Sequence, residues 1–195
     1  MVPPIMPIFR SHLQGELLAV VLLSDDGEFS LTGLAQRLGA PLPTVHREAS
    51  RLEAAGVVAS RRVGNVRIVR ANRRSPAYEP LRELVERYFG VPVIVGEEFS
   101  GVSGIDELYI FGSWADRATG VPGPAPNDID VLAVGHPDRD QAYESALRVE
   151  RRAGKPVNVT IRSADSWSRK EDGFLRQVAA GNLIPIDIPM KDARE

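Results

Sequence analysis

The chain has 195 residues, of which 43% are hydrophobic and 26% charged, the proportions of a globular protein with one large domain or two small ones. It has no cysteine, which excludes disulfides and thiolate zinc sites, and only three histidines, which argues against a structural metal. The longest apolar run, Leu17 to Leu23, is too short to span a membrane, and no secretory signal is visible near Arg10. We therefore expect a cytoplasmic protein without membrane contact.

The net charge of −2 is distributed unevenly along the chain. Between Arg37 and Arg74 there are nine arginines and two glutamates, which give that block a net charge of +7 and leave −9 for the rest. A block this basic indicates a polyanionic partner such as nucleic acid. The alternative is an arginine-rich face that is simply solvated.

Capping residues predict two helices near the N-terminus. Ser11 can cap a helix that ends near Leu23, and Ser30 can cap a second helix that ends at Gly39. The first of these helices carries apolar residues on several sides. It is therefore expected to be buried, either as an ordinary core helix or in a dimer contact.

A third helix is expected from Pro43, a favoured first-turn residue, to about Ala55. Apolar residues at helical spacing predict its inner face, namely Val45, Ala49 and Leu52. Polar residues remain for its outer side, namely Thr44, His46, Arg47, Ser50 and Arg51. Two strands, 57–61 and 66–69, then predict a hairpin around Gly64 with arginines at positions 61, 62, 67 and 70.

This order of elements resembles a winged helix-turn-helix domain over about residues 11–75. The resemblance is carried by Leu-Ala-Gln-Arg-Leu-Gly-Ala, Pro-Thr-Val-His-Arg-Glu and Leu-Glu-Ala-Ala-Gly-Val-Val, and it is closest to bacterial metal-sensor-like regulators. It implies double-stranded DNA as the partner and the third helix as the recognition helix. The residues that would contact the major groove are Thr44, His46, Arg47 and Arg51, and those on the wing that would reach phosphates or the minor groove are Arg62 and Arg67. The metal-sensing cysteines of that family are absent, so metal sensing is not implied, and a winged helix can also serve only protein–protein contacts.

A connecting region is expected after the hairpin. Apolar residues from Tyr78 to Tyr88 have helical spacing, and Gly90 follows them. Residues 91–99 predict a further helix, although their β-branched content also suits a strand. The predicted organisation is residues 1–76 for the winged helix-turn-helix domain, 77–100 for connecting helices and 101–195 for a second domain.

The second domain contains a pattern that suggests a metal and phosphate site. A predicted strand ends at Phe111 and leads into Gly112-Ser113, where a helix would begin and its free N–H groups would favour a phosphate. Asp128 and Asp130 follow in a second apolar run, and alternate residues of a strand point to the same face. Two adjacent carboxylates favour a cation such as Mg²⁺, although they can also be plain surface carboxylates at a strand end.

This pattern, Gly-Ser followed after a spacer by Asp-apolar-Asp, resembles the minimal branch of the polymerase-beta-like nucleotidyltransferase superfamily over roughly residues 90–188. The resemblance implies an α/β domain with a mixed sheet, so that the whole chain is of the α+β class. It also implies Mg²⁺ and a nucleoside triphosphate, ATP by preference, as cofactors. Catalytic and metal-binding roles would fall to Asp128 and Asp130, and nucleotide binding to Gly112 and Ser113.

The chain departs from the superfamily pattern in two ways: the spacer from Trp114 to Asn127 is a little longer than usual, and a third carboxylate is missing. A helix from Asp138 to Ala153 is expected before a cleanly alternating strand, 157–162, and a final helix from Glu171 to Ala180 before an edge strand. In active members of the superfamily, the strand that corresponds to 157–162 supplies a third carboxylate. In this chain, that strand offers Asn158. An amide cannot accept a proton, and loss of a general base typically costs about 10²–10⁴ in rate. We therefore expect binding of Mg²⁺ and nucleotide to be retained better than turnover.

Two functions remain in competition. One is a DNA-binding transcriptional regulator whose second domain binds a nucleotide or a partner, and the resemblance suggests an autoregulating antitoxin, a homodimer, with a toxin protein as partner. The alternative is an active nucleotidyltransferase that transfers a nucleoside monophosphate to a protein, an RNA or a small molecule.

Overall fold

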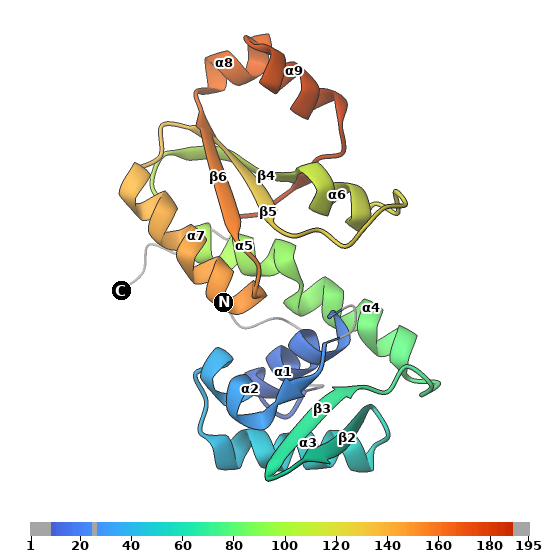
Figure 1. Ribbon diagram of the computed structural model, residues 1–195. Helices are drawn as coiled ribbons and strands as arrows, with labels where there is room; N and C mark the ends of the chain where they lie inside the picture. The colour runs from blue at the N-terminus through green and yellow to red at the C-terminus, as the bar shows by residue number, and fades with distance from the viewer. Residues whose placement is uncertain (1–8, 25–26, 189–195) are drawn as a thin grey trace. The chain divides into compact units, whose positions relative to one another are not determined.

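The computed structural model describes residues 9–24 and 27–188 of the chain. The protein is of the mixed α+β class, as the sequence predicts, with one three-stranded and one four-stranded sheet among the described residues. It divides into two compact units, Met1–Gly90 and Val91–Glu195, and most of their elements are labelled in Figure 1.

The first unit follows the order helix, strand, two helices, hairpin and helix. Its elements are α1 His12–Leu22, β1 Phe29–Ser30, α2 Leu31–Arg37, α3 Leu42–Ala54, β2 Val58–Val63, β3 Val66–Ala71 and α4 Tyr78–Phe89. The three helices and the hairpin expected from the sequence are confirmed. The short strand β1 was not predicted, because two residues that pair only with a distant strand leave no periodic signal.

Local sequence explains where these helices begin and end. The Ser11 side chain accepts a hydrogen bond from the backbone N–H of Gln14, and the Ser30 side chain accepts one from that of Gly33. After α2, Gly39 takes a φ of 58°, which lies in the left-handed region where glycine is favoured. The capping predicted from the sequence is therefore confirmed at both helices.

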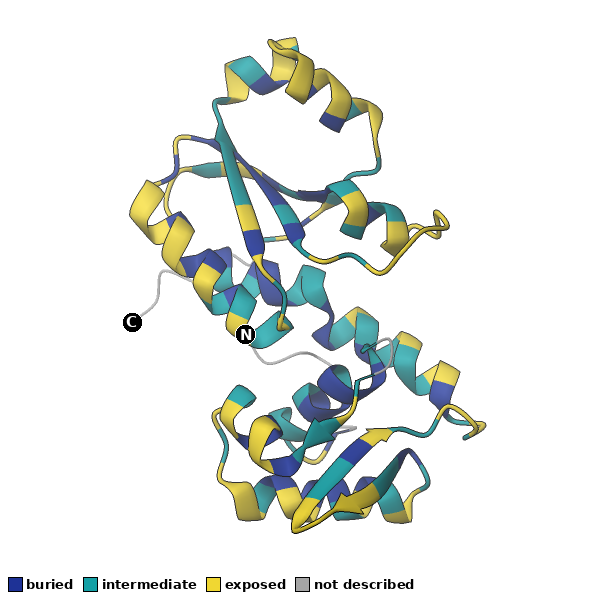
Figure 2. Cartoon of the chain, in the orientation of Figure 1, coloured by how far each residue is buried: buried dark blue, intermediate teal, exposed yellow. Residues whose placement is uncertain are grey.

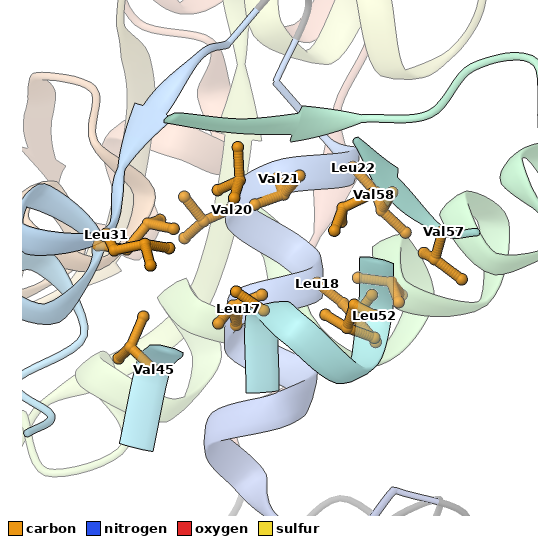
Figure 3. Packing of buried hydrophobic residues seen from close by; sticks show 14 of the residues in the cluster. Leu17, Leu18, Val20, Val21, Leu22, Leu31, Val45, Leu52, Val57 and Val58 are labelled. Carbon is orange, nitrogen blue, oxygen red and sulfur yellow. The ribbon is translucent and has the colours of Figure 1, made fainter. Parts of the chain in front are cut away.

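The core of the first unit is built where the helices meet the sheet. The three strands have the order β1-β3-β2 and are antiparallel throughout. Figure 3 shows the apolar side chains of α1 in contact with residues from α3 and the hairpin. The largest fully buried members of this core are Leu17, Val21, Leu22, Leu34, Val45, Val69 and Val85. Since α1 is covered within its own unit, its apolar sides are explained as core packing.

Helix α4 is part of this same unit. Gly15 of α1 lies so close to Phe89 of α4 that a Cβ on Gly15 would come within 2.1 Å of the ring atom Cζ. The ring of Phe89 also packs edge-to-face on Phe9 at a centroid distance of 5.3 Å. The expected connector, 77–100, is thus divided: α4 packs in the first unit, whereas the following helix α5, Val91–Phe99, belongs to the second.

The second unit is a mixed sheet with helices packed on its faces. Its elements are α5 Val91–Phe99, β4 Ile105–Phe111, α6 Gly112–Ala118, β5 Ile129–Gly135, α7 Arg139–Ala153, β6 Val157–Arg162, α8 Ala164–Arg169, α9 Gly173–Ala180 and β7 Ile184–Pro185. The strand order is β6-β5-β4-β7, with β5 and β6 parallel and the other pairs antiparallel. The mixed sheet and the edge strand at Pro185 were expected, and the short helix α8 was not.

Alternation along β5 divides the core of the second unit into two layers. Ile129, Val131 and Ala133 pack into a cluster with α5 and α7, while Leu132 and Val134 pack with α8 and α9. Figure 2 shows the exposed outer side of α7 and its buried inner side. Asp128 and Asp130 share the parity of Leu132, so they lie on the sheet face that α8 and α9 cover further along.

No helix in the described part of the chain combines the length and the apolar composition that crossing a membrane requires.

Candidate functional site

The first candidate site is the outer side of α3. Val45, Ala49 and Leu52 are buried, as predicted for the inner face. The outer side then carries exposed His46, Arg47 and Arg51, with Thr44 and Ser50 half-buried. The structure thus brings together, on one side of one helix, the four α3 residues that the sequence singles out for DNA contact.

Contacts within α3 hold two of these side chains, and a third, His46, has its Nε2 3.4 Å from Arg67 Nη1 of the hairpin. Arg47 Nη2 donates to Thr44 Oγ1 at 3.4 Å, one turn earlier. Arg51 forms an ion pair with Glu48, which is buried although it is charged. Arg51 itself remains about half exposed, so its guanidinium still has donors directed to solvent.

The hairpin adds a cation beside α3. Its strands join through Gly64 and Asn65, and Gly64 has a φ of 57°, which suits a tight two-residue turn. Arg62 and Arg67 are direct cross-strand partners, so both side chains lie on the same face of the hairpin. Arg62 is exposed. It is therefore the hairpin arginine placed on the α3 side and open to a ligand.

Arg67 has a different environment from the one expected. Its guanidinium donates to Ser50 Oγ at 2.8 Å, to Glu53 Oε2 at 2.6 Å and to Ser60 Oγ at 3.3 Å. Only 14% of its side chain is exposed. Arg67 thus holds the hairpin against α3, and it is poorly placed to reach a phosphate.

Glu53 and Ser60 complete this contact and were not singled out from the sequence. The hydrogen bond from Ser60 lowers the pKa of Glu53, and the charge of Arg67 lowers it further. Ser60 lies opposite Val69 in the hairpin, on the same face as Arg67. Strand alternation alone could have placed Ser60 and Arg67 together, but pairing them with Glu53 requires knowing how the hairpin packs on α3.

The second candidate site lies where β4, α6 and β5 meet. Gly112 begins α6 directly after β4 and has a φ of 71°. A Cβ at this position would come within 2.6 Å of Asp130 Oδ2. Phe111 pairs with Asp130 across the antiparallel strands. The backbone at the start of α6 is therefore packed directly against the Asp130 carboxylate, a closeness that only glycine permits.

Asn158 joins the two carboxylates. It is the parallel-strand partner of Asp130, and its Nδ2 donates to Asp128 Oδ2 at 2.9 Å and to Asp130 Oδ1 at 3.1 Å. Burial raises the pKa of Asp130, the Asn158 hydrogen bond acts in the opposite direction, and the charge of Asp128 raises it again. The structure thus brings together Asp128, Asp130 and Gly112, with Asn158 on the adjacent strand.

Two other carboxylates of this unit make structural contacts. Asp116 accepts a hydrogen bond from Asn182 Nδ2 at 2.8 Å, and Asp165 pairs with Arg169 one turn later in α8. Ser113 is exposed at the first turn of α6. Within the described residues, no group of three or more histidine, aspartate or glutamate side chains is arranged to hold a metal.

The donor set of the pair can be compared with the needs of a magnesium ion. Asp128 and Asp130 are hard oxygen donors, and the carbonyl oxygen of Asn158 is a third, which is the chemistry that Mg²⁺ prefers. In this arrangement, however, the amide nitrogen of Asn158, and not its oxygen, is directed at both carboxylates. The residues therefore fit one ion in type, provided that the amide presents its other end.

No family model and no curated protein matches this chain. Among solved structures, it is similar to a fragment, residues 1–100, of a "possible transcriptional regulatory protein" from Mycobacterium bovis. The two are 23% identical, the match covers 40% of this chain and 78% of that chain, and the TM-score is 0.34. Similarity at this level carries no inference about the present chain.

Proposed function

We propose that the protein is a DNA-binding transcriptional regulator that uses α3 as its recognition helix. The observation that carries this proposal is that Arg62 shares a hairpin face with Arg67, which bonds to α3, while Arg47 and Arg51 are exposed on the outer side of that helix. An α-helix fits the major groove, where arginine can donate two hydrogen bonds to guanine. The hairpin arginine would contact the neighbouring phosphates.

Charge supports the same proposal. The net +7 between Arg37 and Arg74 lies in an otherwise acidic chain, so the attraction to a polyanion is concentrated on the first unit. Cations that neutralise DNA phosphates release condensed counterions, which makes affinity depend on salt. Arg67 and Glu53 neutralise each other in an ion pair. Arg67 therefore positions the hairpin on α3 and adds no free positive charge to this surface.

Binding of the full-length protein to the DNA upstream of its own coding region tests the proposal, with a scrambled duplex of equal length as competitor. Arg47→Ala should reduce the preference for the upstream DNA, by about 1–3 kcal/mol if Arg47 contacts a guanine. Arg151→Ala, which removes an exposed arginine from α7 in the other unit, is the matched control. Equal affinity for both duplexes, or the absence of salt-sensitive binding, would reject DNA recognition.

We propose a second function for the second unit: binding of Mg²⁺ and a nucleoside triphosphate, ATP by preference, with little turnover. The observation that favours it is the contact of Gly112 with Asp130, which sets the start of α6 against the carboxylate pair. Asp128, Asp130 and the Asn158 carbonyl would hold the ion, and the backbone N–H groups at Gly112 and Ser113 would meet a phosphate. When bound, the ion would neutralise the charge of the phosphates.

Efficient transfer is not part of this second proposal, because an amide at position 158 cannot accept the proton of an attacking hydroxyl. The competing function is an active nucleotidyltransferase that modifies a protein, an RNA or a small molecule. Incubation with labelled nucleoside triphosphates, Mg²⁺ and candidate acceptors, followed by mass spectrometry, separates the two. Label transfer that is abolished in the Asp128→Ala, Asp130→Ala double variant would establish the enzyme.

The role of an autoregulating antitoxin would unite both units in one chain. It rests on the family resemblance, as do the toxin partner and the homodimer. A toxin gene beside the coding region would support it, and co-purification of the two products would test it. Light scattering on the purified protein would decide between a monomer and a dimer.

A further inference from the structure

One amide nitrogen holds the carboxylate pair together. Asn158 Nδ2 lies 2.9 Å from Asp128 Oδ2 and 3.1 Å from Asp130 Oδ1, so it lies between the two oxygens. The parallel register of β5 and β6 fixes this position, because Asp130 and Asn158 are direct partners. Asn158 therefore belongs to the same surface as the pair, through the sheet itself.

Two adjacent carboxylates repel each other unless something positive lies between them. The two N–H bonds of the Asn158 amide supply partial positive charge at that place. A divalent cation shared by the pair would occupy the same space, and an oxygen of Asn158 directed at it could serve as a further ligand. The amide cannot present its nitrogen and its oxygen to the same point, so the two arrangements exclude each other.

We propose that Asn158 is a specificity-determining residue that stabilises the Asp128–Asp130 pair without a metal and admits a divalent cation only after its amide rotates. The metal-free arrangement is then a stable state of the site in its own right. Binding of a cation requires the two hydrogen bonds from Nδ2 to break. This inference rests on the proposed use of the pair as a cation site, and it adds that the site is held closed to metal by its own third residue.

Two substitutions of Asn158 separate the role of its amide nitrogen as a hydrogen-bond donor from the role of an oxygen at this position as a metal ligand. In Asn158→Asp, an oxygen replaces the nitrogen, so three carboxylates meet in the absence of metal and all three can bind an ion when metal is present. In Asn158→Ala, both hydrogen bonds are removed and no ligand is added. The proposal therefore requires metal-free stability to fall and metal affinity to rise in Asn158→Asp, with a larger rise in affinity than in Asn158→Ala.

The experiment combines thermal melting in chelator with calorimetric titration of Mg²⁺ and Mn²⁺ into the full-length protein. Asn158→Asp should melt at a lower temperature than the wild type in chelator and should bind Mn²⁺ at least about tenfold more tightly, since a charged ligand replaces a hydrogen-bond donor. Asn158→Ala should also melt lower, with a smaller increase in affinity than Asn158→Asp, because it removes the two hydrogen bonds that oppose binding but adds no ligand. Asn127→Asp adds the same charge at an exposed neighbouring position and should change neither quantity by as much.

Each outcome decides a claim. Equal metal affinity of the wild type and Asn158→Asp would overturn the inference and leave the proposed metal binding intact. Binding by Asn158→Asp alone would refute metal binding by the wild type, and with it the claim that rotation of the Asn158 amide admits a cation. An equal increase in metal affinity in Asn127→Asp would show that any negative charge added near the pair strengthens binding. That result would overturn the inference. Absence of binding in every variant would overturn both claims.

Discussion

Arg67 of β3 and Glu53 of α3 form a 2.6 Å charge-assisted hydrogen bond that joins the hairpin to the helix expected to read DNA. Ser50 and Ser60 bond to the same guanidinium, so the contact has partners on both elements. Arg62, directly opposite Arg67, has no such role and is exposed. Two arginines with the same predicted role therefore differ in environment: Arg67 is bonded to α3, and Arg62 is exposed.

This difference should appear in the stability of the protein. Arg67→Ala removes a largely buried side chain that makes several hydrogen bonds and should lower the free energy of unfolding by about 1–3 kcal/mol. Arg62→Ala removes an exposed side chain and should change it by no more than about 0.5 kcal/mol. Urea denaturation of the full chain, followed by circular dichroism, measures both. Equal effects of the two substitutions would contradict the positioning role of Arg67.

The same contact should depend on pH through Glu53. Its pKa is lowered from the ordinary value of 4.5, so the stabilisation it provides is fully present above that value and is lost as the pH falls through the lowered pKa. Glu53→Gln should therefore be less stable than the wild type at pH 7, and the difference should shrink under acid conditions. Melting temperatures between pH 7 and pH 3 measure this trend. A difference that stays constant down to pH 3 would show that the charge of Glu53 is not involved.

Gly112 should tolerate no side chain. In Gly112→Ala, the new Cβ would come within 2.6 Å of Asp130 Oδ2 at a backbone φ of 71°. Gly120 has a φ of 89° but nothing within 4 Å, so Gly120→Ala carries the backbone strain alone. We expect Gly112→Ala to be destabilised by about 1–3 kcal/mol more than Gly120→Ala, because Asp130 must move. Denaturation followed by the fluorescence of Trp114 and Trp167 would detect this, and equal losses of stability would contradict the close packing at the carboxylate pair.

The boundary between the units predicts which fragments fold. A fragment of residues 1–90 keeps α4 and its packing between Gly15 and Phe89, whereas a fragment of residues 1–76 lacks both. The longer fragment should unfold cooperatively, and the shorter one should expose apolar side chains of α1 and show no cooperative transition. Calorimetry of the two fragments tests this. A cooperative transition of equal midpoint in the shorter fragment would place the domain boundary before α4.

Much of this architecture could be predicted from local signals. The Ser11 and Ser30 caps, the inner face of α3 and the alternating strand 157–162 each depend on residues close in sequence, and the structure confirms them. The 91–99 segment was ambiguous because its valines suit a strand as well as a helix. Packing of Ile94, Val95 and Phe99 against the sheet decides for the helix, and such long-range contacts leave no periodic signal.

The candidate sites likewise depend on long-range contacts that local sequence does not specify. Position 158 could be placed beside Asp130 from the order of elements, but the donation of one amide nitrogen to both carboxylates depends on the register of β5 and β6. In the first unit, the pattern of arginines could not separate Arg62 from Arg67. That distinction depends on where Glu53 meets the hairpin, which is a tertiary contact.

The most direct test of DNA recognition by α3 and the hairpin is the salt dependence of DNA binding in the wild type, Arg62→Ala and Arg151→Ala. If Arg62 neutralises a phosphate, Arg62→Ala should reduce the steepness of log K against log salt by about 0.9 for each phosphate that is no longer neutralised. Arg151→Ala, on the other unit, should leave the slope unchanged. An Arg62→Ala slope equal to that of the wild type, or wild-type binding that does not depend on salt, would contradict the account.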